Sequence, residues 1–197
     1  MKVLDGAGPL AALVWIAAVL VFGARLEGYD QLRHPVSLLG ARGVPDGELF
    51  SVLGFVVPGV LAGVAALALI LRMAGNAPRT LRVAGQMLLL AAVAFVAMGG
   101  LPLDVKDIEN QASQFHASAW LLWLVAFTAG AVALRLGAAR APAWRPLATL
   151  AVACAIWSVC SAFLFEIVMP AAMAQRLAFL GWLAWLLGAW RLIPARG

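Results

Sequence analysis

The residues whose types suit chemistry in this chain are two histidines, two carboxylates and a serine. They are His34, Ser37, Asp104, His116 and Glu166. An imidazole oriented by a carboxylate can act as a general base, and a nearby serine hydroxyl can act as a nucleophile. The same nitrogen and oxygen atoms suit hydrogen bonds to a polar ligand, or a zinc ion. Which chemistry applies depends on whether the fold brings these side chains together.

The composition identifies the class of protein that must position them. Hydrophobic residues make up 64% of the 197 residues, charged residues only 12%, and the mean hydropathy is +0.98. This balance lies far from that of soluble globular domains, so the chain is predicted to be an integral membrane protein. The net charge of +5 comes from basic residues beside helix ends, and no nucleic-acid-binding motif is present.

Six apolar segments are long enough to cross a membrane, which takes about 20 residues of helix. Lipid offers the backbone no hydrogen-bond partner, and the segments are too long for barrel strands, so all six should be helices. We therefore predict an all-α, six-helix membrane bundle that forms one domain over residues 1–197, with the first segment kept rather than cleaved as a signal peptide. The segments are 9–26, 49–71, 81–101, 115–136, 147–169 and 174–193.

The basic residues predict the orientation of the bundle. Threading six helices places most of them on one side, which the positive-inside rule makes cytoplasmic, and both termini fall on that side. Eight of the nine carboxylates fall on the opposite, outer side. The inner basic residues are Lys2, Arg72, Arg79, Arg82, Arg135, Arg140, Arg145, Arg191 and Arg196.

The same threading gathers polar side chains at the outer side. Ser113 is expected to cap the fourth helix, which puts His116 about one turn inside the outer surface. A helix N-terminus disfavours a charged imidazole and leaves a neutral ring suited to a hydrogen bond or a metal. Glu166 lies about 20 residues beyond Pro146, hence roughly 30 Å across the bilayer at a similar outer level. Asp104 enters from the neighbouring loop.

The long outer loop, residues 27–48, carries His34 and Ser37. Its interleaved leucines and valines predict that it packs back onto the helices, so both side chains can join the cluster. Structural roles are also open. Glu166 can form an ion pair with Arg176 across the turn at Pro170, because charges in membranes commonly pair with one another. The two histidines can form hydrogen bonds that hold the loop to the bundle.

Several other residues are interpreted as architectural. Gly59 and Gly63 form a GxxxG pattern in the second segment, which predicts close packing against a neighbouring helix. Tryptophans near predicted helix ends or on lipid faces are interpreted as interface anchors and packing residues rather than as a ligand cage. These are Trp120, Trp123, Trp144, Trp182, Trp185 and Trp190.

Short motifs around the outer loops resemble those of a known family. They are His34-Pro35-Val36-Ser37-Leu38-Leu39-Gly40, Gly43-Val44-Pro45, Phe50, Gly54-Phe55, Leu101-Pro102-Leu103-Asp104 and His116. In these motifs the chain resembles the domain-of-unknown-function 998 family of small prokaryotic six-helix membrane proteins, although Leu101 stands where that family has phenylalanine. Through Ser37, Gly40, Pro45 and Phe50 it shows a weaker likeness to the Frag1/DRAM/Sfk1 group of eukaryotic membrane proteins associated with lipid handling. Neither resemblance implies an established reaction.

Three functions remain as hypotheses. The first is an outward pocket that binds a lipid headgroup or another amphiphile, a reading favoured by the likeness to lipid-handling proteins. The second is a membrane hydrolase in which His116 is the general base, Asp104 or Glu166 orients it, and Ser37 or a metal-bound water attacks. The third is a structural subunit of a larger membrane complex. The ligand-binding candidates are His34, Ser37, Asp104, His116, Glu166 and Arg176.

The expected partners are membrane lipids, with a membrane-protein partner or a homo-oligomer as a further option and no nucleic acid. We assign no cofactor and no metal. The two histidines lack HExxH-like spacing, they do not suit opposed ligation of a haem iron, and the three-histidine metal centre of the alkaline-ceramidase group would need one more. The expected location is the cytoplasmic (inner) membrane of a bacterium or archaeon, crossed several times.

Overall fold

The computed structural model describes residues 6–73, 77–107 and 109–194, so the predicted inner residues Lys2 and Arg196 lie outside the described residues. It contains six helices that are long and apolar enough to cross a membrane. In the described ranges there is no strand, only an isolated bridge between Arg42 and Asp104. The predicted all-helical, multi-pass membrane protein is therefore confirmed.

At the majority of helix ends, the observed bounds differ from the predicted segments by only a few residues. The spanning helices are α2 (Ala7–Arg25), a continuous helix made of α3 (Gly47–Phe50), the π-helix η2 (Ser51–Val56) and α4 (Val57–Arg72), then α5 (Arg79–Gly100), α6 (Gln111–Ala138), α7 (Arg145–Phe163) and α8 (Ala171–Leu192). Three short 3₁₀ helices lie between them: η1 (Val36–Gly40), η3 (Pro142–Trp144) and η4 (Phe165–Ile167).

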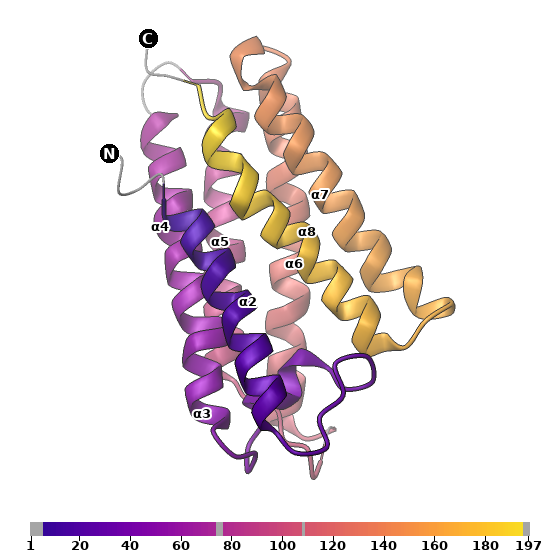
Figure 1. Cartoon of the computed structure of the whole chain (residues 1–197). Helices are drawn as coiled ribbons and strands as arrows, with labels where there is room; N and C mark the ends of the chain where they lie inside the picture. The colour runs from indigo at the N-terminus through magenta and orange to yellow at the C-terminus, as the bar shows by residue number, and fades with distance from the viewer. Residues whose placement is uncertain (1–5, 74–76, 108, 195–197) are drawn as a thin grey trace.

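The helices form a closed bundle. Each spanning helix packs against the next one along the chain, and α2 also packs against α8. Because the chain crosses the bundle an even number of times, α2 starts at the end where α8 finishes (Figure 1). The long loop between α2 and α3 lies at the opposite end, beside the start of α8 (Figure 1).

Two helix boundaries correct the sequence reading. Helix α6 begins at Gln111, and its cap is Asn110, whose side chain accepts a hydrogen bond from the Ser113 amide, so Ser113 is not the cap. Helix α7 ends at Phe163, and Glu166 lies in the short 3₁₀ helix η4, at the last turn of the candidate span Pro142–Ile167. His116 and Glu166 nevertheless remain at the same end of the bundle, because α6 starts where α7 ends.

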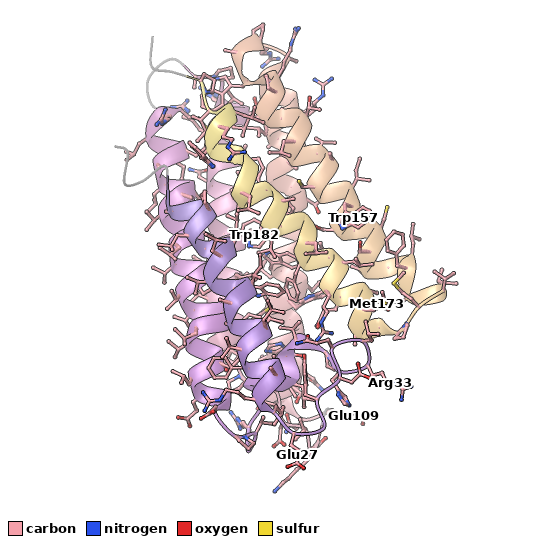
Figure 2. The ribbon with its side chains drawn as sticks, viewed as in Figure 1. Glu27, Arg33, Glu109, Trp157, Met173 and Trp182 are labelled. Atoms are coloured by element: carbon pink, nitrogen blue, oxygen red, sulfur yellow. The ribbon has the colours of Figure 1, made fainter. Side chains whose placement is uncertain are left out.

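Aromatic side chains fill the centre of the bundle. Trp123 and Phe127 of α6 and Trp182 of α8 are almost fully buried, and the Trp123 and Trp182 rings meet edge to face with centroids 6.1 Å apart. Trp182 is seen inside the bundle in Figure 2. Trp185 is buried as well. Of the two expected roles, Trp123, Trp182 and Trp185 have the packing one, and their placement on lipid faces is wrong because they are buried between helices.

Glycines permit the closest helix contact. A Cβ on Gly59 of α4 would lie 2.8 Å from the backbone nitrogen of Val96 in α5. Only hydrogen fits in that space, as the GxxxG pattern predicts for a tight helix pair. Gly99 has the same role near the end of α5, because a Cβ there would lie 2.6 Å from the carbonyl oxygen of Ser51 in η2. The wide turn of the π-helix therefore presses directly on α5.

Candidate functional site

Arg176, in the second turn of α8, ties the long outer loop to the bundle. Its Nη1 donates hydrogen bonds to the carbonyl oxygen of His34 at 2.7 Å and to that of Ala172 at 3.1 Å. Its Nη2 donates to the Tyr29 hydroxyl and to Gln31 Oε1. One guanidinium thus holds three loop residues, which suits the planar, multiple-donor geometry of arginine.

Loop residues reinforce this attachment. Gln175 Oε1 accepts a hydrogen bond of 3.1 Å from the backbone amide of Val36, and Gln31 Nε2 donates to the carbonyl of Val19 in α2. The Tyr29 hydroxyl donates to the carbonyl of Pro35 at 3.2 Å. Burial raises the pKa of Tyr29 above its ordinary value, and the neighbouring guanidinium opposes that rise. The neutral phenol is therefore the form that fits the site.

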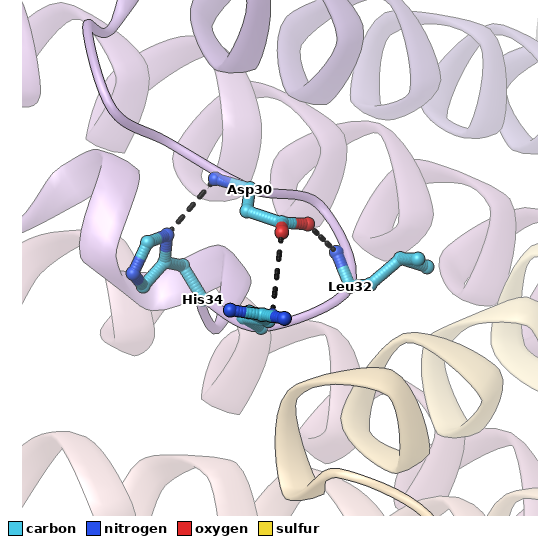
Figure 3. A network of polar contacts seen from close by, with 4 residues as sticks. Asp30, Leu32 and His34 are labelled. Atoms are coloured by element: carbon cyan, nitrogen blue, oxygen red, sulfur yellow. Dashed lines mark hydrogen bonds and ion pairs between the residues drawn. The ribbon is translucent and has the colours of Figure 1, made fainter.

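The His34 side chain is used inside the loop. Its Nδ1 accepts a hydrogen bond of 2.9 Å from the Asp30 amide, while the Asp30 carboxylate accepts from the Leu32 amide at 2.7 Å (Figure 3). Arg33 lies 3.7 Å from the same carboxylate, with its side chain largely exposed. The His34 side chain therefore stabilises the turn of the loop, and it does not line the cavity beside His116.

His116 lies in α6 and faces the end of α5. Its Nδ1 is 3.1 Å from the carbonyl oxygen of Met98 and 3.0 Å from that of Leu101. Carbonyl oxygens only accept hydrogen bonds, so Nδ1 carries the ring hydrogen. In the neutral ring Nε2 is then an acceptor, and it forms no hydrogen bond with any residue that the structure describes. This geometry leaves one imidazole nitrogen for a ligand.

A cavity of about 470 Å³ opens beside His116, between α6, the start of α8, η4 and the outer loop. Its polar wall contains Arg33, Ser37, Ser113, His116, Glu166 and Gln175, and Trp120 adds an aromatic surface. We call this cavity the outer pocket. Glu166 is exposed, and across the described ranges it has no hydrogen bond or ion pair.

The structure brings together three of the sequence-predicted site residues and separates the others. Ser37, His116 and Glu166 line the outer pocket. Asp104 instead organises the loop before α6, where its amide donates to Ser113 Oγ at 3.0 Å and its carboxylate accepts from the Lys106 amide. Asp104 therefore does not orient His116.

The predicted ion pair between Glu166 and Arg176 is wrong. The Arg176 guanidinium faces neutral oxygens of the outer loop, and within the described part of the chain the ion pairs are Arg25 with Asp46 and Asp30 with Arg33. Nor do the described residues place three His, Cys, Asp or Glu side chains where they could hold a metal ion together. His34, Asp104, His116 and Glu166 therefore do not form a shared metal site among the described residues.

An apolar groove lies further along α6 than the outer pocket. It has a volume of about 500 Å³ and is lined by side chains of α6 and α7. Leu121 and Leu124 of the groove follow Ala117 of the pocket at helical spacing on α6, and Phe163 of the groove precedes Glu166 of the pocket. We call it the α6/α7 groove. The outer pocket, which mixes polar and apolar side chains, and the apolar α6/α7 groove thus follow one another along α6.

Sequence reasoning missed Tyr29, Gln31, Arg33 and Gln175. Tyr29 is the single tyrosine of the chain, and Gln175 adjoins Arg176, so both were unusual residues beside a predicted site. Several of their contacts, such as Tyr29 with the Pro35 carbonyl and Gln175 with the Val36 amide, use backbone groups, which leave no mark in the sequence.

A comparison with family models decides the classification. The model described as "Protein of unknown function (DUF998)" matches residues 9–191, from α2 to the last turn of α8. The chain belongs to the DUF998 family. No curated protein and no solved structure was found to match this DUF998 chain. The match covers both the outer pocket and the α6/α7 groove, so the site lies wholly within the DUF998 region.

Proposed function

We propose that this DUF998 protein binds the headgroup of a membrane lipid, or a similar amphiphile, in the outer pocket. The observation that carries the proposal is the order of the two sites along α6, where the pocket residues Ala117 and Trp120 are followed by Leu121 of the α6/α7 groove. An amphiphile has a polar end and an apolar chain, and this site offers surfaces of both kinds in the same order. Small-molecule sites commonly combine an apolar wall with a few polar groups in this way.

The polar residues divide into two roles in this proposal. Ser37, His116 and Glu166 contact the headgroup, because they line the pocket and are not tied to other side chains. Arg176 and His34 hold the loop that forms one wall, as their hydrogen bonds indicate. Asp104 holds the loop before α6 through Ser113.

The proposed orientation places the outer pocket on the outer side of a bacterial or archaeal cytoplasmic membrane. The end of the bundle away from the pocket carries Arg72, Arg79, Arg82, Arg135, Arg140, Arg145 and Arg191 at helix termini. An excess of basic residues in short loops is typical of the cytoplasmic side. Figure 2 labels Glu27 and Glu109 at the end opposite to these termini.

The test is extraction of the protein with its surrounding lipids, followed by lipid analysis of the wild type and two variants. Ala117→Trp fills the outer pocket, because Ala117 is an exposed residue of its wall. Ser118→Trp is the matched control, since Ser118 is exposed on the same helix and lines neither the pocket nor the groove. Specific enrichment of a lipid in wild type and Ser118→Trp, lost in Ala117→Trp, supports the proposal. Equal lipid profiles in all three proteins contradict it.

A hydrolase is the second candidate, favoured by the presence of Ser37 and the acceptor Nε2 of His116 in one cavity. Its weakness is the orienting group, because His116 is held by two backbone carbonyls rather than by Asp104 or Glu166. Turnover of a lipid ester that disappears in both Ser37→Ala and His116→Ala would establish it. Co-purification of a stoichiometric membrane protein, without lipid enrichment, would point instead to a subunit of a complex.

A further inference from the structure

The outer pocket presents hydrogen-bond acceptors on one side. His116 offers Nε2 as an acceptor, because its Nδ1 hydrogen lies between the carbonyls of Met98 and Leu101. Glu166 adds two carboxylate oxygens from η4, and no described residue pairs with them. Two acceptors from different elements suit a group that carries several N–H donors. A protonated primary amine has three such donors and no acceptor, as the lysine ammonium does.

The opposite charge is supplied by Arg33. Arg33 is part of the pocket lining on the outer-loop side, and its side chain is 82% exposed. The contact with Asp30 is long, at 3.7 Å between Nε and Oδ2, and exposed pairs of this kind are weak. The Nη atoms of Arg33 therefore remain available for a phosphate, which guanidinium groups bind through paired hydrogen bonds.

These charges favour one class of lipid headgroup. This inference rests on the proposed lipid-binding function. We propose that the outer pocket selects a zwitterionic phospholipid whose headgroup ends in a primary ammonium. The ammonium donates to Glu166 and to Nε2 of His116, and the phosphate accepts from Arg33. The acyl chain of the bound lipid lies along the α6/α7 groove.

Two other common headgroup types fit this wall less well. A quaternary ammonium has no N–H donor, and proteins bind it in cages of several aromatic rings. Trp120 is the one aromatic side chain of the pocket wall as described. An anionic headgroup without an amine brings no donor ammonium for Glu166, and its negative charge is repelled by that carboxylate.

The experiment compares three phospholipids with identical acyl chains, whose headgroups are ethanolamine, choline and glycerol. The purified full-length protein is incubated at pH 8 with an equimolar mixture of the three lipids. The lipids that it retains are quantified by native mass spectrometry. The expected result is retention of the ethanolamine lipid about tenfold above the other two, a ratio that corresponds to about 1.4 kcal/mol. Free phosphoethanolamine is added in a second arm, and failure to displace the lipid shows that the acyl chain is also required.

Variants assign the preference to the proposed groups. Glu166→Gln should reduce the ethanolamine-to-choline ratio to about one, because the neutral amide no longer attracts an ammonium. Arg33→Gln should weaken retention of the ethanolamine and choline lipids alike, since both carry the phosphate. Glu109→Gln is the control, because Glu109 is an exposed carboxylate of the neighbouring loop that does not line the pocket. Thermal unfolding of each variant, followed by tryptophan fluorescence, checks that it is folded.

The outcomes separate this inference from the function on which it rests. Retention of the glycerol or choline lipid at least as strong as that of the ethanolamine lipid overturns the headgroup assignment and leaves lipid binding intact. An unchanged preference in folded Glu166→Gln also overturns it. Absence of any lipid retained by the wild type beyond the Ala117→Trp level overturns both.

Discussion

Nη1 of Arg176 donates a hydrogen bond of 2.7 Å to the backbone carbonyl of His34, a residue 142 positions earlier in the chain. The contact joins the start of α8 to the outer loop, and neutral oxygens of Tyr29 and Gln31 complete the set. No carboxylate pairs with Arg176 in the described portion of the protein. Arg176 therefore positions the part of the pocket wall that the loop forms, through hydrogen bonds to backbone carbonyls and neutral side chains.

Arg176→Met should loosen the outer loop, because it keeps an unbranched apolar stem but removes the guanidinium donors. Hydrogen bonds that involve a charged group contribute about 1.5–3 kcal/mol each, so loss of the set should lower the unfolding free energy by about 2 kcal/mol or more. Hydrogen exchange should increase at residues 29–36. Both effects are measured on the purified protein, by thermal unfolding and by exchange followed with mass spectrometry.

The matched control for Arg176 is Arg140→Met at the other end of the bundle. Arg140 is exposed, and exposed substitutions away from special features usually change stability by less than about 0.5 kcal/mol. An equal rise in hydrogen exchange of the outer loop in Arg176→Met and Arg140→Met would show that Arg176 does not position the loop.

The six spans could be predicted because each is a long apolar run, and lipid leaves helices as the way to satisfy the backbone. The positions of the tryptophans could not. An indole is compatible with both a membrane interface and a packed interior, and only the contacts of Trp123 with Phe179 and Trp182 place it in the core. The π-helix at Ser51–Val56 was also missed, since its hydrogen-bond pattern has no distinctive composition.

Tyr29 should titrate above its ordinary value of 10.0, because burial of the hydroxyl raises its pKa in the folded protein. A folded pKa above the unfolded one means that the neutral phenol contributes stability below about pH 10, and that this contribution is lost as the pH rises through the folded pKa. Tyr29 is the single tyrosine of the chain, so the absorbance of tyrosinate reports its ionisation alone.

Tyr29→Phe separates this titration from that of other alkaline groups. The variant keeps the ring and removes the ionisable hydroxyl, so its stability should fall less between pH 10 and higher pH than that of the wild type. A wild-type titration midpoint at or below 10 would mean that the hydroxyl is solvated and that the loop does not cover it.

Gly59→Ala should destabilise the pair of helices α4 and α5. The added Cβ would lie 2.8 Å from the Val96 backbone nitrogen and 3.1 Å from the Ala92 carbonyl oxygen, so the helix backbones must separate. Overpacking of this kind typically costs about 1–3 kcal/mol. Thermal unfolding of the detergent-solubilised protein measures the effect.

Gly63→Ala provides the comparison on the same helix face. Its nearest neighbours, Leu89 Cδ1 and Ala92 Cβ, would lie 3.7 and 3.8 Å from the new Cβ, an ordinary contact distance. Alanine is also a better helix former than glycine by about 1 kcal/mol in water. We therefore expect little loss or a small gain in stability. Similar losses of stability in Gly59→Ala and Gly63→Ala would contradict the conclusion that Gly59 is packed more tightly than Gly63.

The candidate site could be predicted in outline, because alternating helices bring the end of α5, the start of α6 and the end of α7 to one side of the membrane. That rule placed His116 near Glu166 and Asp104. It could not distinguish the side chains that enter the cavity from those that hold loops. Asp104 and His34 form local hydrogen bonds to backbone amides, a use common to aspartate and histidine in any turn.

Alanine variants at the two ends of the bundle should differ in how much lipid they retain. His116→Ala and Glu166→Ala remove polar groups of the outer pocket, whereas Arg79→Ala and Arg140→Ala change the opposite end. If each pocket residue forms a hydrogen bond with a charged ligand group, its loss weakens lipid retention by about 1.5–3 kcal/mol, which is about tenfold or more. The arginine variants should retain lipid within about twofold of wild type, since exposed charges contribute little to a distant site. Native mass spectrometry of the four proteins measures retention directly. Small and equal effects in all four would show that the cavity beside His116 is not where the ligand binds.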